Sequence, residues 1–246
     1  MDNIKNNDLD YAANDAKDIA KIMKKLEGKI YNKVNLYTYA DKTENIPSLA
    51  NIVDALYSLQ KNASADDTVM IFLAGHGESL NKNQYIFITK DAEQYGSGEY
   101  KMSTVLKWAN VNDALKNLKC TKLLFLDTCR GGSVDILYLL KHELSLSTRD
   151  EQSKIILFTS TSQNQVAEEC DQFSNGCFTY AIKKGLGEYL KDNNEKMPAD
   201  DNNKDNKITF IELVNYVIKV LEKITAGQKP DISTPNGGIN DIFYKR

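Results

Sequence analysis

The chain has 246 residues, of which 41% are apolar and 26% charged, so it is long enough and apolar enough to bury the core of one compact domain. A formal net charge of −3, with lysines and acidic residues interspersed, leaves no basic stripe and excludes nucleic acid as an expected partner. Because no apolar run is long enough to span a bilayer and the polar N-terminus is unlike a signal peptide, we expect a cytoplasmic protein without a membrane partner.

Helices and strands are predicted to alternate along the chain. Apolar side chains recur at helical spacing in residues 11–27 and 47–59, which is typical of helices that pack on a sheet. Further helices are expected at 103–118 and 178–189. Short apolar runs predict strands at 35–39, 69–74, 85–89, 122–127 and 155–160. This alternation predicts a three-layer α/β/α fold with a mostly parallel sheet.

Two segments that contain glycine follow two of these strands. The sequence AGHG at 74–77 contains His76, and the sequence DTCRGG at 127–132 contains Cys129. Since the carboxyl ends of parallel strands meet at one edge of a sheet, we expect His76 and Cys129 on the same rim. Either residue alone would more often be structural. Together, at matched strand ends, they indicate a thiolate nucleophile activated by a histidine.

These two segments resemble the histidine and cysteine loops of the caspase-like cysteine peptidases, in which the two residues are about 50 positions apart. Asp127 and Thr128 stand where caspases have Gln-Ala, and this resembles the metacaspase-like branch, which includes bacterial members. Further matches are NDA at 14–16, GCFT at 176–179 and ITFIEL at 208–213. The resemblance implies one caspase-like peptidase domain over 1–246, with a larger portion at about 1–140, a connector at about 141–154 and a smaller portion at about 155–246.

The same resemblance implies a cysteine endopeptidase that requires no cofactor. Cys129 would attack the scissile carbonyl, His76 would protonate the leaving amine, and the backbone amides of Gly77 and Cys129 would hold the oxyanion. A helix within 131–140 would lower the pKa of the thiol. The alternative is an inactive caspase-like scaffold or a calcium-responsive binding module.

Substrate specificity is expected to depend on Asp15 and Asp127. In metacaspase-like enzymes the matching aspartates line the pocket for the residue before the cut. Two carboxylates favour a guanidinium or an ammonium group, so we expect cleavage after Arg or Lys. The alternative is that Asp15 caps or pairs locally and that Asp127 only orients the cysteine loop.

The polar connector lies where this family often carries its activation cleavage. It offers Lys141, Arg149 and Lys154 as basic sites for self-cleavage. Any protease would also cut an exposed loop tip of this kind. We therefore predict self-cleavage in the connector, and a test of this prediction must show that the cut depends on Cys129.

The first strand of the caspase-like fold is expected to be absent from this chain. That strand precedes the helix with Asp15, but residues 1–10 are almost wholly polar. A slot is then expected between the strands at 35–39 and 69–74. Because an unfilled slot leaves two strand edges unpaired, we expect an upstream regulatory module or a partner chain to complete the sheet.

A calcium-loop pattern precedes the last predicted helix. Positions 1, 3, 5, 7, 9 and 12 of the pattern are occupied by Asp201, Asn203, Asp205, Lys207, Thr209 and Glu212. Asn206 replaces the glycine of the sharp turn, and no clear entering helix precedes the loop. Thr209 and Glu212 also form a capping box, so the alternative is an ordinary helix start.

The four cysteines are Cys120, Cys129, Cys170 and Cys177. Without a secretory signal, reduced thiols are expected. The absence of a close CxxC pair disfavours a zinc site. Apart from Cys129, the cysteines are interpreted as structural.

Overall fold

A four-stranded sheet forms the centre of the protein. The computed structural model describes residues 9–81, 84–128, 155–162, 165–191, 195–200, 205–234 and 242–245. The strand order is β1 (Thr68–Gly75), β5 (Thr121–Thr128), β6 (Ile155–Thr159) and β10 (Asp231–Ser233). The first three strands are parallel and β10 is antiparallel to β6. The prediction of a mostly parallel sheet is confirmed.

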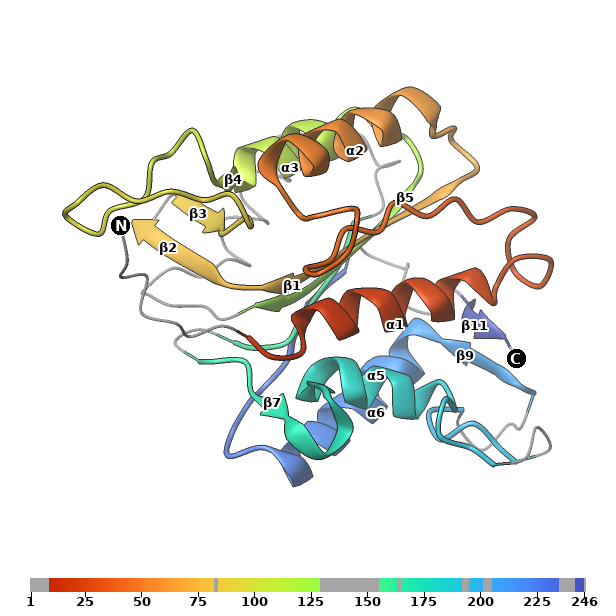
Figure 1. Cartoon of the computed structure of the whole chain (residues 1–246). Coiled ribbons are helices and arrows are strands. Elements are labelled where there is room, and N and C mark those ends of the chain that lie inside the picture. The colour runs from red at the N-terminus through yellow and green to blue at the C-terminus, as the bar shows by residue number, and fades with distance from the viewer. Residues whose placement is uncertain are drawn as a thin grey trace.

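Helices cover both faces of this sheet (Figure 1). On one face lie α1 (Ala12–Lys24), α5 (Cys177–Gly185) and α6 (Phe210–Ile224), and on the other lie α2 (Leu49–Asn62) and α3 (Trp108–Leu115). Strand side chains alternate between the two cores. Phe125 packs in the core with α1, α5 and α6, whereas Leu124 packs in the core with α2 and α3. The α/β/α prediction is therefore confirmed.

Local capping explains where two of the helices begin. The hydroxyl of Ser48 accepts a hydrogen bond from the backbone N–H of Asn51 at the start of α2. At the start of α6, Thr209 and Glu212 form the predicted capping box. Each cap satisfies a backbone group that the first helical turn leaves without a partner.

Smaller antiparallel sheets surround the central one. They are β2 (Gly77–Asn81), β3 (Gln84–Phe87) and β4 (Leu106–Lys107); the hairpin of β7 (Glu169–Cys170) and β8 (Asn175–Gly176), whose turn contains the 3₁₀ helix η1 (Asp171–Phe173); and the pair of β9 (Lys207–Thr209) and β11 (Ile242–Lys245). The apolar run at 85–89 was predicted as a strand but belongs to the β2–β4 sheet. This run is outside the central sheet because its strand, β3, pairs with β2, which begins directly after His76.

Three predicted elements differ from the structure. Residues 35–39 pair with no strand in the described part of the chain, so the predicted strand is wrong, since a strand requires a hydrogen-bonded neighbour. The helix predicted at 103–118 is limited to α3, because β4 occupies the residues before it. The helix predicted at 178–189 ends at Gly185, after which the chain turns.

Among the described residues, no helix combines the length and the apolarity that crossing a bilayer requires.

Candidate active site

Pairing of β1 with β5 aligns the histidine loop with the cysteine loop. Gly75, which precedes His76, is the register partner of Thr128, which precedes Cys129. Cys129 itself lies outside the described residues, as do Arg130 and the rest of that loop. His76 is half-buried between β1 and β2, and its carbonyl accepts the backbone N–H of Ile88 at 2.9 Å. The sheet register therefore places the residues that precede His76 and Cys129 side by side at the same rim.

A tyrosine from β3 connects the two loops. The hydroxyl of Tyr85 lies 2.7 Å from the hydroxyl of Thr128, and this hydrogen bond is buried. The same tyrosine hydroxyl packs on the Cα of Gly77, where a Cβ would overlap it. Glycine at position 77 is therefore required for the approach of Tyr85, and Tyr85 fixes the histidine loop relative to the residue before Cys129.

We expect Gly77→Ala to destabilise the protein by about 1–3 kcal/mol, because the added methyl group overlaps Tyr85 and forces a shift of the site. Gly96→Ala is the matched control, since a Cβ at Gly96 meets nothing within 4 Å. The control should change the free energy of unfolding by less than about 0.5 kcal/mol. Urea denaturation of both variants measures the difference. Equal effects would contradict the contact with Tyr85.

The carboxyl groups of Asp15 and Asp127 converge on Gly176. A Cβ built on Gly176 would lie 2.8 Å from Oδ2 of Asp127 and 3.0 Å from Oδ2 of Asp15. Both aspartates are buried, at 3% and 6% exposure. They come from α1 and from the end of β5, so the tertiary structure brings together two residues that are distant in sequence.

Each of the two carboxylates has hydrogen-bond donors from the same part of the chain. Asp15 accepts the backbone N–H of Gly176 at 3.1 Å and Nδ2 of Asn175 at 2.8 Å. Asp127 accepts the hydroxyl of Thr179 at 2.9 Å. These donors are distant from both aspartates along the chain, so the bonds are tertiary and not the local pairing of Asp15 that the alternative expected. They also hold both carboxylates in fixed positions.

Burial raises the pKa of Asp15 above its ordinary value, and the nearby charge of Asp127 raises it further. The hydrogen bonds from Asn175 and Gly176 lower this pKa without cancelling the effect of burial. Burial also raises the pKa of Asp127, against the hydrogen bond from Thr179, which lowers it. The pair therefore retains a proton at pH values where exposed aspartates are fully ionised.

The raised pKa values predict that stability falls as the pH increases. Between the pKa of an unfolded aspartate, about 3.9, and the raised value, the folded protein binds more protons than the unfolded chain, so the free energy of unfolding decreases with pH. Asp15→Asn removes one such group and should reduce this decrease between about pH 5 and pH 9. Asp54→Asn, on the exposed side of α2, is the control. Urea denaturation at both pH values gives the slopes, and a wild-type slope in Asp15→Asn would contradict the raised pKa.

The space between the two aspartates is small. A void of about 20 Å³ is lined by Asp15, Asp127, Gly75 and Gly176, among others. This is room for about one water molecule and not for a guanidinium side chain. Binding of an arginine between these carboxylates therefore requires movement of the wall, of which Gly176 is a part.

A second layer of polar residues orients this wall. The ammonium group of Lys183 donates to Oδ1 of Asn175 at 2.7 Å and to Asp18 at 2.5 Å. Because Oδ1 of Asn175 faces Lys183, its Nδ2 group faces Asp15. Sequence reasoning missed Asn175, Lys183, Thr179 and Tyr85. The signals in the sequence were the GCFT match, which contains Thr179 and lies close to Asn175 and Lys183, and the strand predicted at 85–89, which contains Tyr85.

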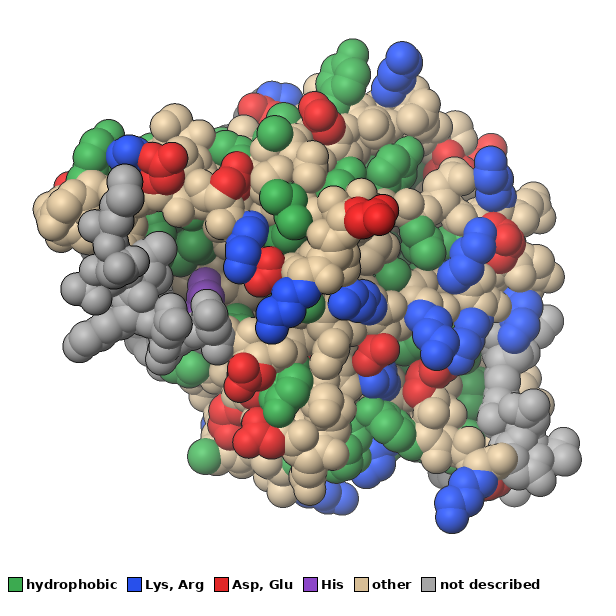
Figure 2. Space-filling model, viewed as in Figure 1, with side chains coloured by type: hydrophobic (Ala, Val, Ile, Leu, Met, Phe, Trp, Pro, Cys, Tyr) green, Lys and Arg blue, Asp and Glu red, His purple; other side chains and the backbone are tan. Residues whose placement is uncertain are grey.

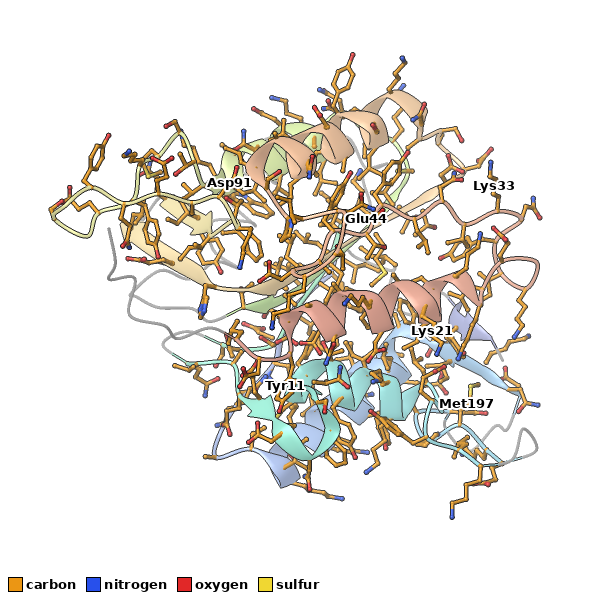
Figure 3. The ribbon with its side chains drawn as sticks, in the orientation of Figure 1. Tyr11, Lys21, Lys33, Glu44, Asp91 and Met197 are labelled. Carbon is orange, nitrogen blue, oxygen red and sulfur yellow. A yellow bond between two sulfur atoms is a disulfide. The ribbon has the colours of Figure 1, made fainter. Side chains whose placement is uncertain are left out.

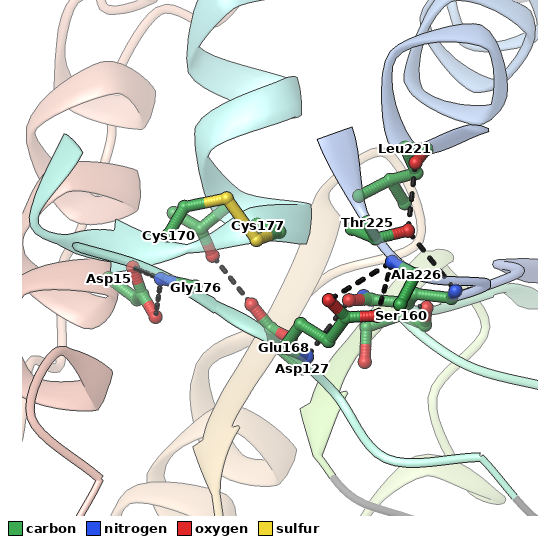
Figure 4. Close-up of a disulfide and its surroundings, with 12 residues drawn as sticks. Asp15, Asp127, Ser160, Glu168, Cys170, Gly176, Cys177, Leu221, Thr225 and Ala226 are labelled. Carbon is green, nitrogen blue, oxygen red and sulfur yellow. Dashed lines mark hydrogen bonds between the residues drawn. A yellow bond between two sulfur atoms is a disulfide. The ribbon is translucent and has the colours of Figure 1, made fainter. Parts of the chain in front are cut away.

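A disulfide joins Cys170 to Cys177 beside this wall (Figure 4). The expectation of reduced thiols is therefore wrong for these two residues. The physical reason is the β7–β8 hairpin, which brings their Cα atoms to 5.0 Å, a distance suited to a disulfide. Cys120 is the free cysteine of the described part of the chain and is buried, in agreement with a structural role.

The predicted calcium loop is only partly described. Asp201 and Asn203 lie outside the described residues. Asn206 has a φ of 59°, so it adopts the left-handed conformation that the glycine of the pattern would provide. Glu212 bonds to Thr209 in the capping box, and Asp205 accepts the N–H of Lys207 at 2.9 Å. Over the described ranges, no three His, Cys, Asp or Glu side chains are grouped as metal ligands.

The connector residues Lys141, Arg149 and Lys154 lie outside the described residues as well.

A mostly parallel sheet between two helix layers, with a histidine loop and a cysteine loop at paired strand ends, defines the caspase-like class of α/β proteins. Comparison with known proteins gives the family: residues 3–233 match the caspase domain of the C14 peptidases, and the chain belongs to that family. No curated protein matches in sequence.

Solved structures share the fold at low sequence identity. A Geobacter sulfurreducens protein is 13% identical with a TM-score of 0.60, and the match covers 95% of this chain and 88% of that one. Caspase-1 from Spodoptera frugiperda is 14% identical with a TM-score of 0.54, and the match covers 94% of this chain and 81% of that one. At these identities the likeness concerns the fold alone.

Proposed function

We propose that this protein is a cysteine endopeptidase in which Cys129 is the nucleophile and His76 is the general acid and base. The observation that carries the proposal is the β1–β5 register, which pairs the residue before His76 with the residue before Cys129. A thiolate beside a histidine can attack a peptide carbonyl. The backbone amides of Gly77 and Cys129 are proposed to hold the oxyanion.

Covalent labelling of the thiol tests this proposal directly. Burial raises the pKa of Cys120, so that thiol should react slowly. Iodoacetamide at neutral pH should therefore modify Cys129 first, and His76→Ala should slow that modification. Peptide mapping by mass spectrometry identifies the site. Equal labelling of Cys120 and Cys129, or labelling that His76→Ala leaves unchanged, would favour the inactive scaffold.

The proposed specificity is cleavage after Arg or Lys in the manner of the metacaspase-like branch. Its support is the convergence of Asp15 and Asp127 on Gly176, since a cation of the substrate would neutralise two carboxylates that are costly to ionise when buried. Because the void beside the two aspartates is only about 20 Å³, the proposed pocket would have to widen to admit an arginine. Opening it is proposed to be part of activation.

Activation is proposed to involve an upstream module or partner and self-cleavage in the connector. Lys141, Arg149 and Lys154 are the proposed sites because they match the basic specificity. Intact mass after incubation, for the wild type and for Cys129→Ala, tests self-cleavage: fragments that form only in the wild type support it. Fragments formed equally in both would point to a contaminating protease.

Calcium is proposed as a regulator at the loop before α6, supported by the left-handed conformation of Asn206 and by the β9 pairing of the residues that follow it. Asp201, Asn203, Asp205 and Glu212 would supply oxygen ligands to Ca²⁺. Titration of the EDTA-treated protein with Ca²⁺, followed by calorimetry, tests the site against Asp205→Asn.

A cytoplasmic location remains our proposal from the sequence, and the Cys170–Cys177 disulfide is the feature that weighs against it.

A further inference from the structure

The Cys170–Cys177 disulfide closes a short loop that forms the wall beside Asp15 (Figure 4). We call the residues between the two cysteines the wall loop. Two groups of this loop donate to the carboxylate of Asp15, the backbone N–H of Gly176 at 3.1 Å and Nδ2 of Asn175 at 2.8 Å. An arginine that takes their place on Asp15 requires the wall loop to move.

The β7–β8 ladder that encloses the wall loop is short. It has two register pairs, Glu169 with Gly176 and Cys170 with Asn175. A two-stranded hairpin of this size is marginally stable without further support. In its turn, Ser174 has a φ of 53°, a left-handed conformation that is costly for a residue other than glycine. The disulfide therefore limits how far the wall loop can depart from this conformation.

Both ends of the wall loop are anchored independently of the disulfide. Next to Cys170, the carboxylate of Glu169 accepts the backbone N–H of Tyr11 at 3.0 Å. Figure 3, in which Tyr11 is labelled, shows the start of α1 beside the hairpin. At the other end, the N–H of Cys177 donates to the carbonyl of Glu168 at 2.9 Å. Opening the disulfide thus leaves the ends of the loop in place and gives freedom to the residues between them.

The position of the disulfide gives it more influence on the wall loop than on the fold as a whole. Two hydrophobic cores, one on each face of the sheet, hold the fold. The entropy that a cross-link removes from the unfolded chain grows with the length of the loop that it closes, and Cys170 and Cys177 are only seven positions apart. Its main effect on the folded protein is local.

The two sulfur atoms have different surroundings, and the difference favours thiol–disulfide exchange. Cys170 is more exposed than Cys177, so an incoming thiolate reaches Cys170 first. Cys177 begins the nine-residue helix α5. Because the N-terminus of a helix stabilises a thiolate, Cys177 is the better leaving group of the two.

We propose that Cys170 and Cys177 form a reversible redox site, at which a dithiol reductant opens the disulfide and lets the wall loop move away from Asp15. A thiolate of the reductant attacks Sγ of Cys170, and Cys177 leaves as a thiolate that takes up a proton. The second thiol of the reductant then displaces Cys170, which also takes up a proton. Two electrons thus pass to the two cysteines, and the reductant becomes a disulfide.

Only part of this proposal depends on the proposed function. The redox step and the movement of the wall loop stand by themselves. Their consequence for the substrate rests on the proposed cleavage after Arg or Lys, because Asp15 is the carboxylate that the wall loop occupies. Reduction is expected to favour binding of arginine, and oxidation to oppose it.

Acidic side chains surround the exposed side of the disulfide and determine the choice of reductant. Asp10, Glu169 and Asp171 are half-buried or exposed around the hairpin. Figure 2 shows acidic side chains gathered over this part of the molecule. They repel an anionic thiol such as glutathione, so uncharged dithiothreitol is the probe.

Alkylation of Cys129→Ala tests the redox step, since this variant has no proposed nucleophile to interfere. The protein is equilibrated with graded ratios of reduced to oxidised dithiothreitol, alkylated and mapped by mass spectrometry. We expect Cys170 and Cys177 to become alkylated together as the ratio rises, with an unchanged circular dichroism spectrum, and to pair again on reoxidation. A disulfide that is reduced only when the protein unfolds, or two thiols that never pair, would overturn the proposal.

Hydrogen exchange on the same variant tests the movement of the wall loop without a substrate. The amides of 175–177 should exchange about tenfold faster, or more, after reduction, whereas those of α6 should not change. Adding Cys170→Ala and Cys177→Ala together should give the fast exchange under both redox conditions. Cys120→Ala is the control and should respond like the parent, because Cys120 is a free thiol outside the loop. Equal exchange in both redox states would overturn the effect on the wall.

Calorimetry with a peptide ending in arginine separates this proposal from the proposed function. Reduced Cys129→Ala should bind the peptide about tenfold more tightly, or more, than the oxidised form, and the same peptide ending in citrulline should show no such difference. Equal affinity of both forms for arginine would overturn the effect of the disulfide on the pocket. If the wall loop loosens but neither form binds arginine, the redox site stands and the proposed specificity fails.

Discussion

Replacing Cys129 by alanine is expected to abolish peptide hydrolysis, with a loss of about 10³-fold or more in kcat/KM. The size of the loss follows from the role proposed for the thiolate, because removal of a covalent nucleophile leaves only binding and the oxyanion site. The assay is hydrolysis of fluorogenic peptides that end in Arg, Lys, Asp or Leu. His76→Ala should cause a loss of similar order, since nucleophile and base act as a unit.

Cys120→Ala is the matched control for this experiment. Cys120 is a buried free thiol at the start of β5, at the opposite end of the strand from Cys129. Its replacement should leave kcat/KM within a few-fold of the wild type. Hydrolysis that survives in Cys129→Ala, or that is lost in Cys120→Ala with the fold intact, would contradict the assignment of the nucleophile.

A peptide ending in arginine is expected to be cleaved about 100-fold faster, or more, than the same peptide ending in citrulline. Citrulline has nearly the same shape as arginine but no charge, so the comparison isolates the electrostatic contribution of Asp15 and Asp127. A buried charge that loses its hydrogen-bonded partner typically costs about 2–5 kcal/mol. The ratio of the two kcat/KM values measures this contribution.

Replacing the aspartates should remove the preference. Asp127→Asn keeps the size of the side chain and an oxygen that can accept the hydroxyl of Thr179, so the fold should persist. The ratio for arginine over citrulline should then fall toward one. The exposed Asp54→Asn should retain the wild-type ratio. Cleavage after Asp, or an unchanged ratio in Asp127→Asn, would favour the alternative in which Asp15 caps or pairs locally and Asp127 only orients the cysteine loop.

Binding of the cationic substrate should also release a proton from the pair formed by Asp15 and Asp127. Because burial raises the pKa values of Asp15 and Asp127, the free pair holds a proton that the arginine displaces. The KM for the arginine peptide is therefore expected to fall as the pH increases through the raised pKa values, whereas the KM for the citrulline peptide should not.

The sequence alone was sufficient for the elements that depend on local pattern. The apolar runs before His76 and Cys129 are strands, because residues buried on both faces of a sheet must be apolar. The capping box of Thr209 and Glu212 begins a helix as predicted, since it involves only neighbours in the chain. Family membership was also predictable, because it rests on short motifs and their spacing.

Only the tertiary structure decided the features that need partners from distant segments. Residues 35–39 have a strand-like pattern but are not a strand, because a ladder requires a neighbour. The pairing of Cys170 with Cys177 depends on a hairpin turn that the spacing of the cysteines does not specify. The contact of Tyr85 with Gly77 depends on the path of a separate sheet. The small space between Asp15 and Asp127 likewise depends on where Gly176 lies, which is set by the packing of α1, β5 and the β7–β8 hairpin together.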